Sequence, residues 1–513
     1  MMTGRHRKKS QIVVSDVTYR IFYTLYLLIL FWILLLNLNV LNNLSQYILP
    51  ISLLFFIATI ICVYIFRKKL TYMGTVINGK ILMLMFILLF VIISVIGLNL
   101  RVTPTWDYNA VHEAAFEWVR EGQISDLSYF ARYPNNNMIL FVITIFYRIT
   151  KFVFPGITNI GFIKASIILN SLLITSSIFF IGMSAKKIYG ASSFYLSIFF
   201  TLFFTPIILY SEILYTDTLG LFLISLIIYI IIEKMNCFKI IHLVIIGFLF
   251  ALGYQIKAFV IIILVGLSII ILLQKNLVLI RKLLFILLLS FSFIVTSVIV
   301  SDKLDESIGI TENLYDQHQF PLSHWIMMSL NPKADGGFND EDYQFTKSII
   351  GKKQKENDIN QKIEKRINYF GVKGLIRHIF LKKLTRTWTN GAMASDDYAN
   401  RKNIYNGLLQ RYFTNSGDKH YIYVIYSQLT HTILIIMIIV TGIRMFFYRN
   451  DTINLLNVSI FGLILFLMIW ECNSRYIYSY IPLFVLTSLQ CFFPLIKNEE
   501  YTQTRKQEKG SLI

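Results

Sequence analysis

The sequence predicts an all-α polytopic membrane protein, and three observations support this fold class. Hydrophobic residues make up 56% of the 513 residues and charged residues only 15%, which is not the balance of a soluble globular protein. Apolar runs close to the ~20 residues that a helical span requires recur along the whole chain. Because only a helix satisfies all of its own backbone hydrogen bonds within lipid, each run is predicted to be helical.

The apolar runs predict about 12 to 13 membrane helices. Segment 138–154 is the exception for two reasons. Its apolar part before Arg148 is short, and the cationic loops all fall on the cytoplasmic side only if this segment does not cross the membrane. We therefore expect it to be re-entrant or interfacial. The runs expected to span are 21–41, 49–66, 81–99, 160–183, 191–210, 218–233, 240–256, 258–273, 283–300, 422–443, 452–470 and 476–495.

The distribution of Lys and Arg predicts the orientation of the chain. Short loops rich in these residues face the cytoplasm, which places both termini inside and the loops 100–137 and 301–421 outside. The same loops, together with anionic lipid, account for the net charge of +19, so no nucleic-acid partner is expected. The cationic loops are 5–9, 67–80, 186–187, 234–239, 275–282, 444–449 and 497–509.

The sequence divides into five regions of one multi-pass protein of the cell membrane. Region 301–421 is polar and is expected to form a small extracytoplasmic domain or a lid. Its apolar residues at helical spacing between Lys and Arg predict a helix that lies on the membrane surface, namely Ile359, Ile363, Ile367 and Phe370. The other regions are an N-terminal tail with two extra spans (1–80), a transmembrane core with the first outer loop (81–300), the C-terminal spans (422–496) and a cytoplasmic tail (497–513).

The first outer loop contains the stretch WDYNAVHEAAFEWVREG, which predicts an amphipathic helix from about Tyr108 to Glu121. Asp107 would cap the N-terminus of this helix. A carboxylate held at a membrane edge beside a tryptophan is costly to desolvate and is often functional, so Asp107 has two open interpretations, a cap and a functional group. The apolar face, expected to rest on the membrane, consists of Val111, Ala114, Ala115 and Trp118.

Charged residues also lie at the outer ends of later runs. Asp217 either caps the next span or meets Asp107 across a cavity, where the two carboxylates would share a proton, divide acid and base roles or hold a divalent cation. Lys257 either marks a helix end as a snorkelling lysine or contacts a lipid-linked phosphate. Glu471 and Arg475, four residues apart, either pair as a salt bridge or leave Arg475 to bind phosphate.

Region 301–421 adds a mixture of aromatic and acidic residues. His324 and Trp325 are residue types that suit sugar recognition, whereas the Gly-rich turn with Asp340 and Asp342 is similar to a calcium loop but lacks the EF-hand spacing. The four cysteines are scattered without metal-ligand spacing. We therefore predict no metal-ligating residues, and a divalent cation is the only cofactor left open.

Taken in order, these motifs resemble those of the GT-C superfamily of integral membrane glycosyltransferases. The likeness is greatest to the bacterial branch related to protein O-mannosyltransferases and to the aminoarabinose transferase of lipid A. It extends over most of the chain from about residue 81 onward and implies a GT-C-like fold. The motifs are the first-loop Asp107 with its amphipathic helix, RYPNNN at 132–137, YTD at 215–217, GYQIK at 253–257, and a late E…RY…P with Glu471, Arg475, Tyr476 and Pro482.

The resemblance implies transfer of a sugar from a polyprenyl-phosphate donor to a cell-envelope glycan, lipid or protein on the outer face. Asp107 matches the family's first-loop aspartate, the general base for the acceptor hydroxyl, and Asp217 would orient donor or acceptor. Lys257 and Arg475 would neutralise the phosphate leaving group. The further substrate-binding residues would be Glu471, Tyr476, Arg132, His324 and Trp325, together with His112 or Glu113 in place of the second carboxylate that the family has where this chain has Tyr108.

Two alternative activities are compatible with a multi-pass chain that has a large outer loop. A polysaccharide polymerase or ligase would use glycans linked to polyprenyl pyrophosphate. A transporter of lipid-linked sugars would place its ionisable groups within the spans, whereas nearly all charges of this chain lie at the ends of the runs. The charge distribution therefore favours the transferase over the transporter.

Overall fold

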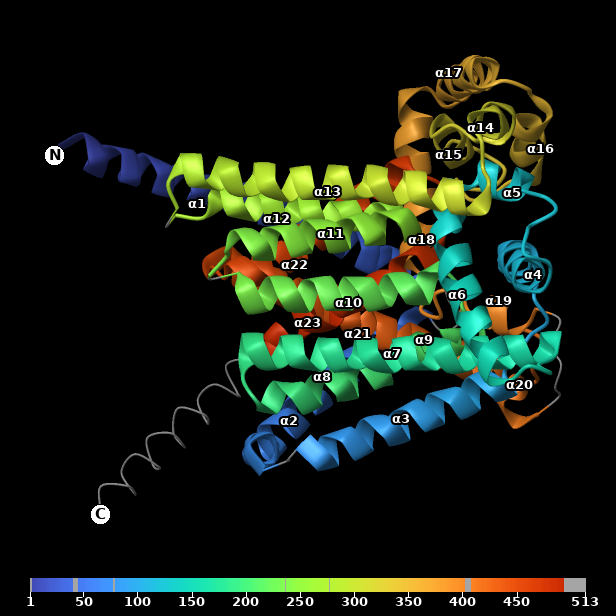
Figure 1. Ribbon diagram of the computed structural model, residues 1–513. Helices are drawn as coiled ribbons and strands as arrows, with labels where there is room; N and C mark the ends of the chain where they lie inside the picture. The colour runs from blue at the N-terminus through green and yellow to red at the C-terminus, as the bar shows by residue number, and fades with distance from the viewer. Residues whose placement is uncertain are drawn as a thin grey trace.

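The computed structural model describes residues 2–39, 45–76, 79–235, 237–275, 277–401 and 407–492, and every regular element in them is a helix. Most of the long helices lie side by side as a bundle (Figure 1). The prediction of an all-helical polytopic membrane protein is therefore confirmed. The predicted cytoplasmic tail 497–513 lies outside the described residues.

Nine helices in the described part of the chain are long and apolar enough to cross a membrane, or ten if a bent pair counts as one span. The bent pair joins α8 (Ser192–Phe203) to Pro206–Glu212 at 71°. The expected number, about 12 to 13, is higher because α11 (Ile240–Ile256) and the helix Ala258–Leu273 are shorter than a full span. The nine are α1 (Met2–Leu38), α2 (Ser45–Val76), α3 (Gly79–Asn99), α6 (Asn137–Val153), α7 (Asn159–Tyr189), α10 (Thr216–Lys234), α13 (Leu279–Ile308), α21 (His420–Phe447) and α22 (Asp451–Ile469).

The last predicted run, 476–495, is divided among three short helices. A 3₁₀ helix, η6 (Ser474–Tyr480), leads into α23 (Ile481–Ser488), and η7 (Leu489–Cys491) follows. Pro482 stands in the first turn of α23, where its missing N–H costs no hydrogen bond. The division brings the side chains of η6 to the end of the bundle instead of its middle.

The two ends of the bundle differ, as Figure 1 shows. The N-terminus and the short connections after α7, α10, α12 (Ile261–Leu273) and α21 lie at one end, which we call the terminal end. The other end, the loop end, carries the first long loop and a cap made of α14 to α20. These elements are α4 (Trp106–Glu121), α5 (Ser128–Arg132), α14 (Glu312–His318), α15 (Ser323–Ser329), α16 (Asp340–Ser348), α17 (Lys352–Arg377), α18 (Leu384–Trp388), α19 (Ser395–Ala399) and α20 (Leu408–Phe413).

Helix α6 corresponds to segment 138–154, which was expected not to cross the membrane. The stretch Pro134–Val153 is long and apolar enough to cross, so the argument from its short length was wrong. In Figure 1, however, α6 runs across the axis of the bundle at the loop end, and it packs mainly against α4. Its position at that end favours an interfacial helix, which stays a prediction.

Helix α4 confirms the predicted amphipathic helix, with two corrections. The helix starts at Trp106, and Thr105 is its N-cap, so Asp107 lies within the first turn and does not cap the helix. Trp106 adopts a positive φ of 55°, a backbone conformation set by tertiary contacts that the local sequence does not specify. The predicted apolar face is buried as expected, but it packs on α6 and not on the membrane.

Helix α17 occupies the predicted surface segment of the cap, but its exposed face is not the predicted one. Ile359 is fully buried, and the ring of Phe370 packs on His378 with centroids 4.6 Å apart. Gly371 then breaks the helical backbone with φ 56°. The predicted face is therefore divided: Ile359 is buried beside the partner helix α15, whereas Ile367 is 43% exposed.

Candidate functional site

Six of the predicted site residues converge at the loop end of the bundle, although they come from distant parts of the chain. We call this group the charged cluster, and it consists of Asp107, Asp217, Lys257, Glu471, Arg475 and Tyr476. The first turn of α4, the first turn of α10, the junction of α11 with the next helix, and the segment from α22 to η6 supply them. Each residue stands at a helix end, which explains why the bundle topology brings them together.

An ion triad of Asp217, Lys257 and Arg475 forms the buried part of the charged cluster. The Lys257 ammonium donates a hydrogen bond of 2.8 Å to Oδ1 of Asp217, and Nε of Arg475 lies 3.7 Å from Oδ2. Asp217 makes no capping bond, since α10 has Tyr215 at its N-cap position without a side-chain cap. Lys257 does not snorkel to water, because it is only 7% exposed. The interpretations of Asp217 as a helix cap and of Lys257 as a snorkelling lysine were therefore wrong.

Glu471 and Tyr476 form a second part of the charged cluster. The Tyr476 hydroxyl donates a hydrogen bond of 3.0 Å to Glu471, and no ion pair joins Glu471 to Arg475 among the described residues. The predicted salt bridge between them is therefore wrong. Burial raises the pKa of Glu471 to about 7, and the nearby Asp107 carboxylate adds to the effect. Glu471 thus changes its charge close to neutral pH.

Asp107 is anchored by a chain of hydrogen bonds and not by its own helix. The Tyr129 hydroxyl donates a bond of 2.9 Å to the Asp107 carboxylate and accepts one of 2.7 Å from the Asn136 amide. The Tyr215 hydroxyl donates a hydrogen bond of 2.9 Å to the side-chain oxygen of Asn136. Asp107 is half-buried and acts electrostatically on Lys257. Its carboxylate therefore faces the ion triad while it remains reachable from solvent.

Several members of this network were not among the predicted residues. Tyr129, Asn136 and Tyr215 lie in or beside the motifs RYPNNN and YTD, so proximity in sequence to Asp107 and Asp217 was the available signal. Arg401 gave no such signal. Its guanidinium lies over the rings of Tyr398 and Trp106, at 4.0 and 5.1 Å, and acts on Asp107 across almost three hundred residues of sequence.

Glu212 is a further carboxyl group near Arg401. It is 1% exposed, and neither of its oxygens has a hydrogen-bond partner among the described residues. Arg401 is the cation that acts on it. A buried, unpaired carboxyl group beside a cation is costly and marks the region between α9 (Pro206–Leu209) and α19 as part of the same polar interior.

Two of the predicted residues are structural and lie away from the charged cluster. His112 is fully buried between the Tyr147 hydroxyl and the Asn159 amide, at 2.7 and 2.6 Å, and burial lowers its pKa. Its neighbour Glu113 is half exposed and accepts a bond of 3.4 Å from Asn159. His112 therefore links α4 to α6 and α7. Neither residue is placed to replace a second carboxylate beside Asp107.

The three predicted residues of α5 and the cap have different positions. Arg132 donates a bond of 3.1 Å to Tyr343 and joins α5 to the cap. His324 is a buried cap residue bonded to Thr346, and burial lowers its pKa to about 3. Trp325 alone borders the charged cluster, because its ring stacks at 5.4 Å on Trp470, the residue before Glu471.

The Gly-rich turn of the cap is not arranged as a calcium loop. Asp342 is fully buried, and its oxygens receive Arg366 at 2.7 and 2.9 Å and Lys362 at 2.9 Å. Arg366 and Lys362 therefore already pair with both oxygens of the Asp342 carboxylate, which is not arranged to bind a calcium ion. In the part of the chain that the structure describes, no group of three or more His, Cys, Asp or Glu side chains could hold a metal ion.

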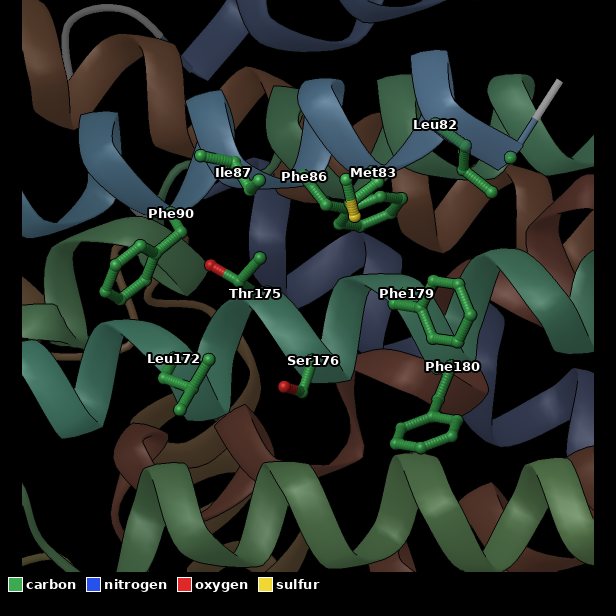
Figure 2. Close-up of a pocket in the computed structure, with 11 residues that line it drawn as sticks. Leu82, Met83, Phe86, Ile87, Phe90, Leu172, Thr175, Ser176, Phe179 and Phe180 are labelled. Carbon is green, nitrogen blue, oxygen red and sulfur yellow. The ribbon is translucent and has the colours of Figure 1, made fainter. Parts of the chain in front are cut away.

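A separate apolar groove lies between α3 and α7, and Figure 2 shows the side chains that face it. Its volume is ≈ 500 Å³, within the range of small-molecule sites, but among the described residues that line it only Thr175 and Ser176 have polar side chains. Such a groove accepts hydrocarbon and provides no acid, base or cation. The chemistry that the described residues offer is therefore at the charged cluster, where a buried lysine and a partly buried arginine share one carboxylate and a second carboxylate faces them.

Comparisons with known proteins give one family and a distant structural likeness. The sequence model of a family described as conserved hypothetical integral membrane protein matches residues 9–492. The crystal structure of ArnT from Cupriavidus metallidurans bound to undecaprenyl phosphate has a TM-score of 0.33 and 11% identity, covering 80% of this chain and 78% of that one. Its apo structure has a TM-score of 0.32 and 12% identity, covering 79% and 76%. A search of curated proteins gave no match.

Proposed function

Since the chain belongs to the family of conserved hypothetical integral membrane proteins, whose description names no activity, we propose its activity from the charged cluster. The protein is a membrane glycosyltransferase with a GT-C-like fold that moves a sugar from a polyprenyl-phosphate donor to a cell-envelope glycan, lipid or protein. One observation carries this proposal. The buried Lys257 and the partly buried Arg475 share the single carboxylate of Asp217 and face the half-buried carboxylate of Asp107.

The pair of cations supports the phosphate side of the proposal. Lys257 and Arg475 together carry one more positive charge than Asp217 neutralises, so the ion triad attracts an anion. Arg475 offers a planar guanidinium that bonds phosphate oxygens in pairs, whereas Lys257 acts as a point charge. A phosphate that leaves with the electron pair of the broken bond gains negative charge, and these cations stabilise that charge.

The position of Asp107 supports the acceptor side of the proposal. In the reaction, the acceptor hydroxyl oxygen forms a bond to the anomeric carbon of the sugar while its proton passes to the Asp107 carboxylate. The bond between the anomeric carbon and the phosphate oxygen breaks at the same centre. Tyr129 holds Asp107 in place, and Trp325, Trp470 and Tyr476 border the cluster with rings that suit the apolar faces of a sugar.

The loop end is proposed to face outward. Lys186 and Lys187 lie in the last turn of α7, Arg444 in the last turn of α21, and Lys275 between α12 and α13, so these cations belong to the terminal end, which the positive-inside rule places in the cytoplasm. A transporter of lipid-linked sugars is disfavoured, because the charged cluster lies at helix ends and not in the middle of the bundle. A polymerase or ligase that uses polyprenyl pyrophosphate is the second candidate, and the additional cation Arg401 beside Asp107 favours it.

The substitution Asp107→Asn tests the proposed transferase. Removing a positioned general base costs about 10²- to 10⁴-fold in rate, so sugar transfer from a polyprenyl-phosphate donor in membranes should fall by that factor. Glu121→Gln is the matched control, since Glu121 is an exposed carboxylate at the other end of the same helix. Unchanged transfer by Asp107→Asn at equal expression would remove Asp107 from the mechanism. Activity with a pyrophosphate-linked glycan alone would favour the polymerase or ligase.

A further inference from the structure

The segment after the break at Gly371 carries an exposed amphipathic stripe, which we call the docking stripe. Val372, Ile376 and Phe380 stand four residues apart and are 78%, 54% and 43% exposed, so they form one apolar column along the helix. Lys373 and Arg377 stand one position further on and form a parallel exposed column of cations. Three large apolar side chains left open to water on one helix face require a partner.

Two residues beside the docking stripe on the same segment fix it to the protein. His378 is buried and bonds the carbonyl of Ser329 at 2.8 Å, and Ile379 packs against the hydrophobic core of the bundle. The segment His378–Lys383 is a π-helix, η5, that continues α17 toward α18. The direction in which the docking stripe points is therefore set by packing and not by a mobile loop.

The docking stripe is continuous with the lipid-facing surface of α1. The indole N–H of Trp32 donates a hydrogen bond of 2.7 Å to the carbonyl of Phe380. Trp32 is 40% exposed, and its neighbours Leu28 and Leu35 on the same helix are 64% and 53% exposed. Trp32 lies within the last two turns of the candidate span Asp16–Leu38, and a tryptophan near the end of a span is typical of the boundary between acyl chains and head groups. Phe380 therefore lies at the depth of this boundary.

We propose that the docking stripe binds anionic phospholipids of the leaflet at the loop end. The apolar column enters the acyl boundary, while Lys373 and Arg377 extend their apolar stems along it and place their charges on the lipid phosphates. Because the same segment joins the cap to the bundle, this contact also holds the cap against the membrane. The docking stripe lies after the break at Gly371 and consists of other residues than the predicted face, of which Ile359 is buried and Ile367 is exposed.

Spin labels on α17 test this proposal. A label at I376C and a control label at Q361C, an exposed position before the break, would be compared in nanodiscs of phosphatidylglycerol or phosphatidylcholine. Serine would replace the native Cys62, Cys237, Cys472 and Cys491. In phosphatidylglycerol, the label at 376 should be accessible to oxygen and protected from an aqueous nickel chelate, whereas the label at 361 should show the reverse. K373Q/R377Q should lower the equilibrium constant between the docked and the undocked segment about thirtyfold, because each cation contributes to binding at an anionic surface.

Two outcomes would overturn the proposal. One is equal exposure of the labels at 376 and 361 to the nickel chelate in phosphatidylglycerol. The other is that the label at 376 stays equally protected from the nickel chelate when phosphatidylcholine replaces phosphatidylglycerol and when K373Q/R377Q is introduced. If the chain without its cysteines does not fold, hydrogen exchange of the unaltered protein replaces the labels. Backbone amides of 372–380 should exchange more slowly in phosphatidylglycerol than in phosphatidylcholine, and equal exchange would contradict the docking stripe.

Discussion

Two buried aspartates are each held between a lysine and an arginine, yet their surroundings differ. Asp342 of the cap receives two hydrogen bonds from Arg366, an ion pair from Lys362 at 2.9 Å and an amide bond from Asn331 at 2.7 Å. All of these partners belong to the cap itself. Asp342 therefore ties helices α15, α16 and α17 together as a closed structural site.

Asp217 of the charged cluster has fewer and longer contacts. Lys257 gives one hydrogen bond, while Arg475 approaches only to 3.7 Å, and its Nε has no hydrogen-bond partner in the described chain. A buried donor without a partner costs free energy that a bound ligand can recover. The presence of an ion pair therefore does not distinguish a functional site from a structural one, whereas the satisfaction of its polar atoms does.

The largest expected difference between the two sites concerns removal of the carboxylate. Asp342→Asn leaves Lys362 and Arg366 without their counterion and should lower the free energy of unfolding by about 3 kcal/mol. The sugar transfer per folded molecule should stay near that of the unaltered protein. Asp217→Asn should lower transfer at least about a hundredfold, because Lys257 and Arg475 lose the group that positions them.

Thermal unfolding in detergent and transfer rates normalised to folded protein would measure both effects. Asp217→Asn also costs stability, since Lys257 is buried, so the normalisation is essential. Equal losses of normalised activity in the two variants would show that Asp217 and Asp342 have the same structural role. That result would remove the distinction between a structural site around Asp342 and a functional site around Asp217.

A smaller difference is expected in the pH dependence of stability. Burial raises the pKa of Glu471 to about 7 from 4.5, so its contribution to stability is complete below pH 4.5 and decreases as the pH rises through 7, by about 3 kcal/mol at most. For Asp342, burial opposes ionisation, but hydrogen bonds from Arg366 lower the pKa below 3.8. Its contribution is complete above pH 3.8 and is lost in acid.

The substitution Glu471→Gln isolates this effect. The variant should keep its melting temperature between pH 5 and 7, where the unaltered protein loses stability, because glutamine does not ionise. Asp342→Asn should instead remove part of the acid sensitivity below pH 4. A pH slope between 5 and 7 that Glu471→Gln leaves unchanged would show that another group titrates there.

Much of the architecture could be predicted because it depends on local composition. Apolar runs are visible in any window of the sequence, and each of them is helical in the described chain. The members of the charged cluster could be selected because Asp217, Lys257 and Arg475 interrupt or end such runs. Their roles in transfer stay predictions, as do the boundaries of the five regions and the outward orientation of the loop end.

The remaining features depend on contacts between distant residues. The start of α4 at Trp106, with Thr105 as its N-cap and a positive φ at Trp106, has no local sequence signal. His112 and His324 have functional residue types but are buried by helices that the sequence does not place beside them. Arg401 lies far along the chain from Asp107, so only the folded bundle reveals that it acts on the same site.

The smallest expected effect comes from exchanging arginine for lysine at the two sites. Arg366→Lys loses one of the two hydrogen bonds to Asp342 and should lower the free energy of unfolding by about 1 kcal/mol. Arg475→Lys should cost less stability, because the Nε of Arg475 makes no hydrogen bond to Asp217. It should instead raise the KM for the polyprenyl-phosphate donor about tenfold with little change in stability, since lysine lacks the rigid planar pair of N–H donors that matches two phosphate oxygens. If Arg475→Lys lowers the melting temperature as much as Arg366→Lys and leaves KM unchanged, the guanidinium of Arg475 holds the bundle together and does not receive a phosphate.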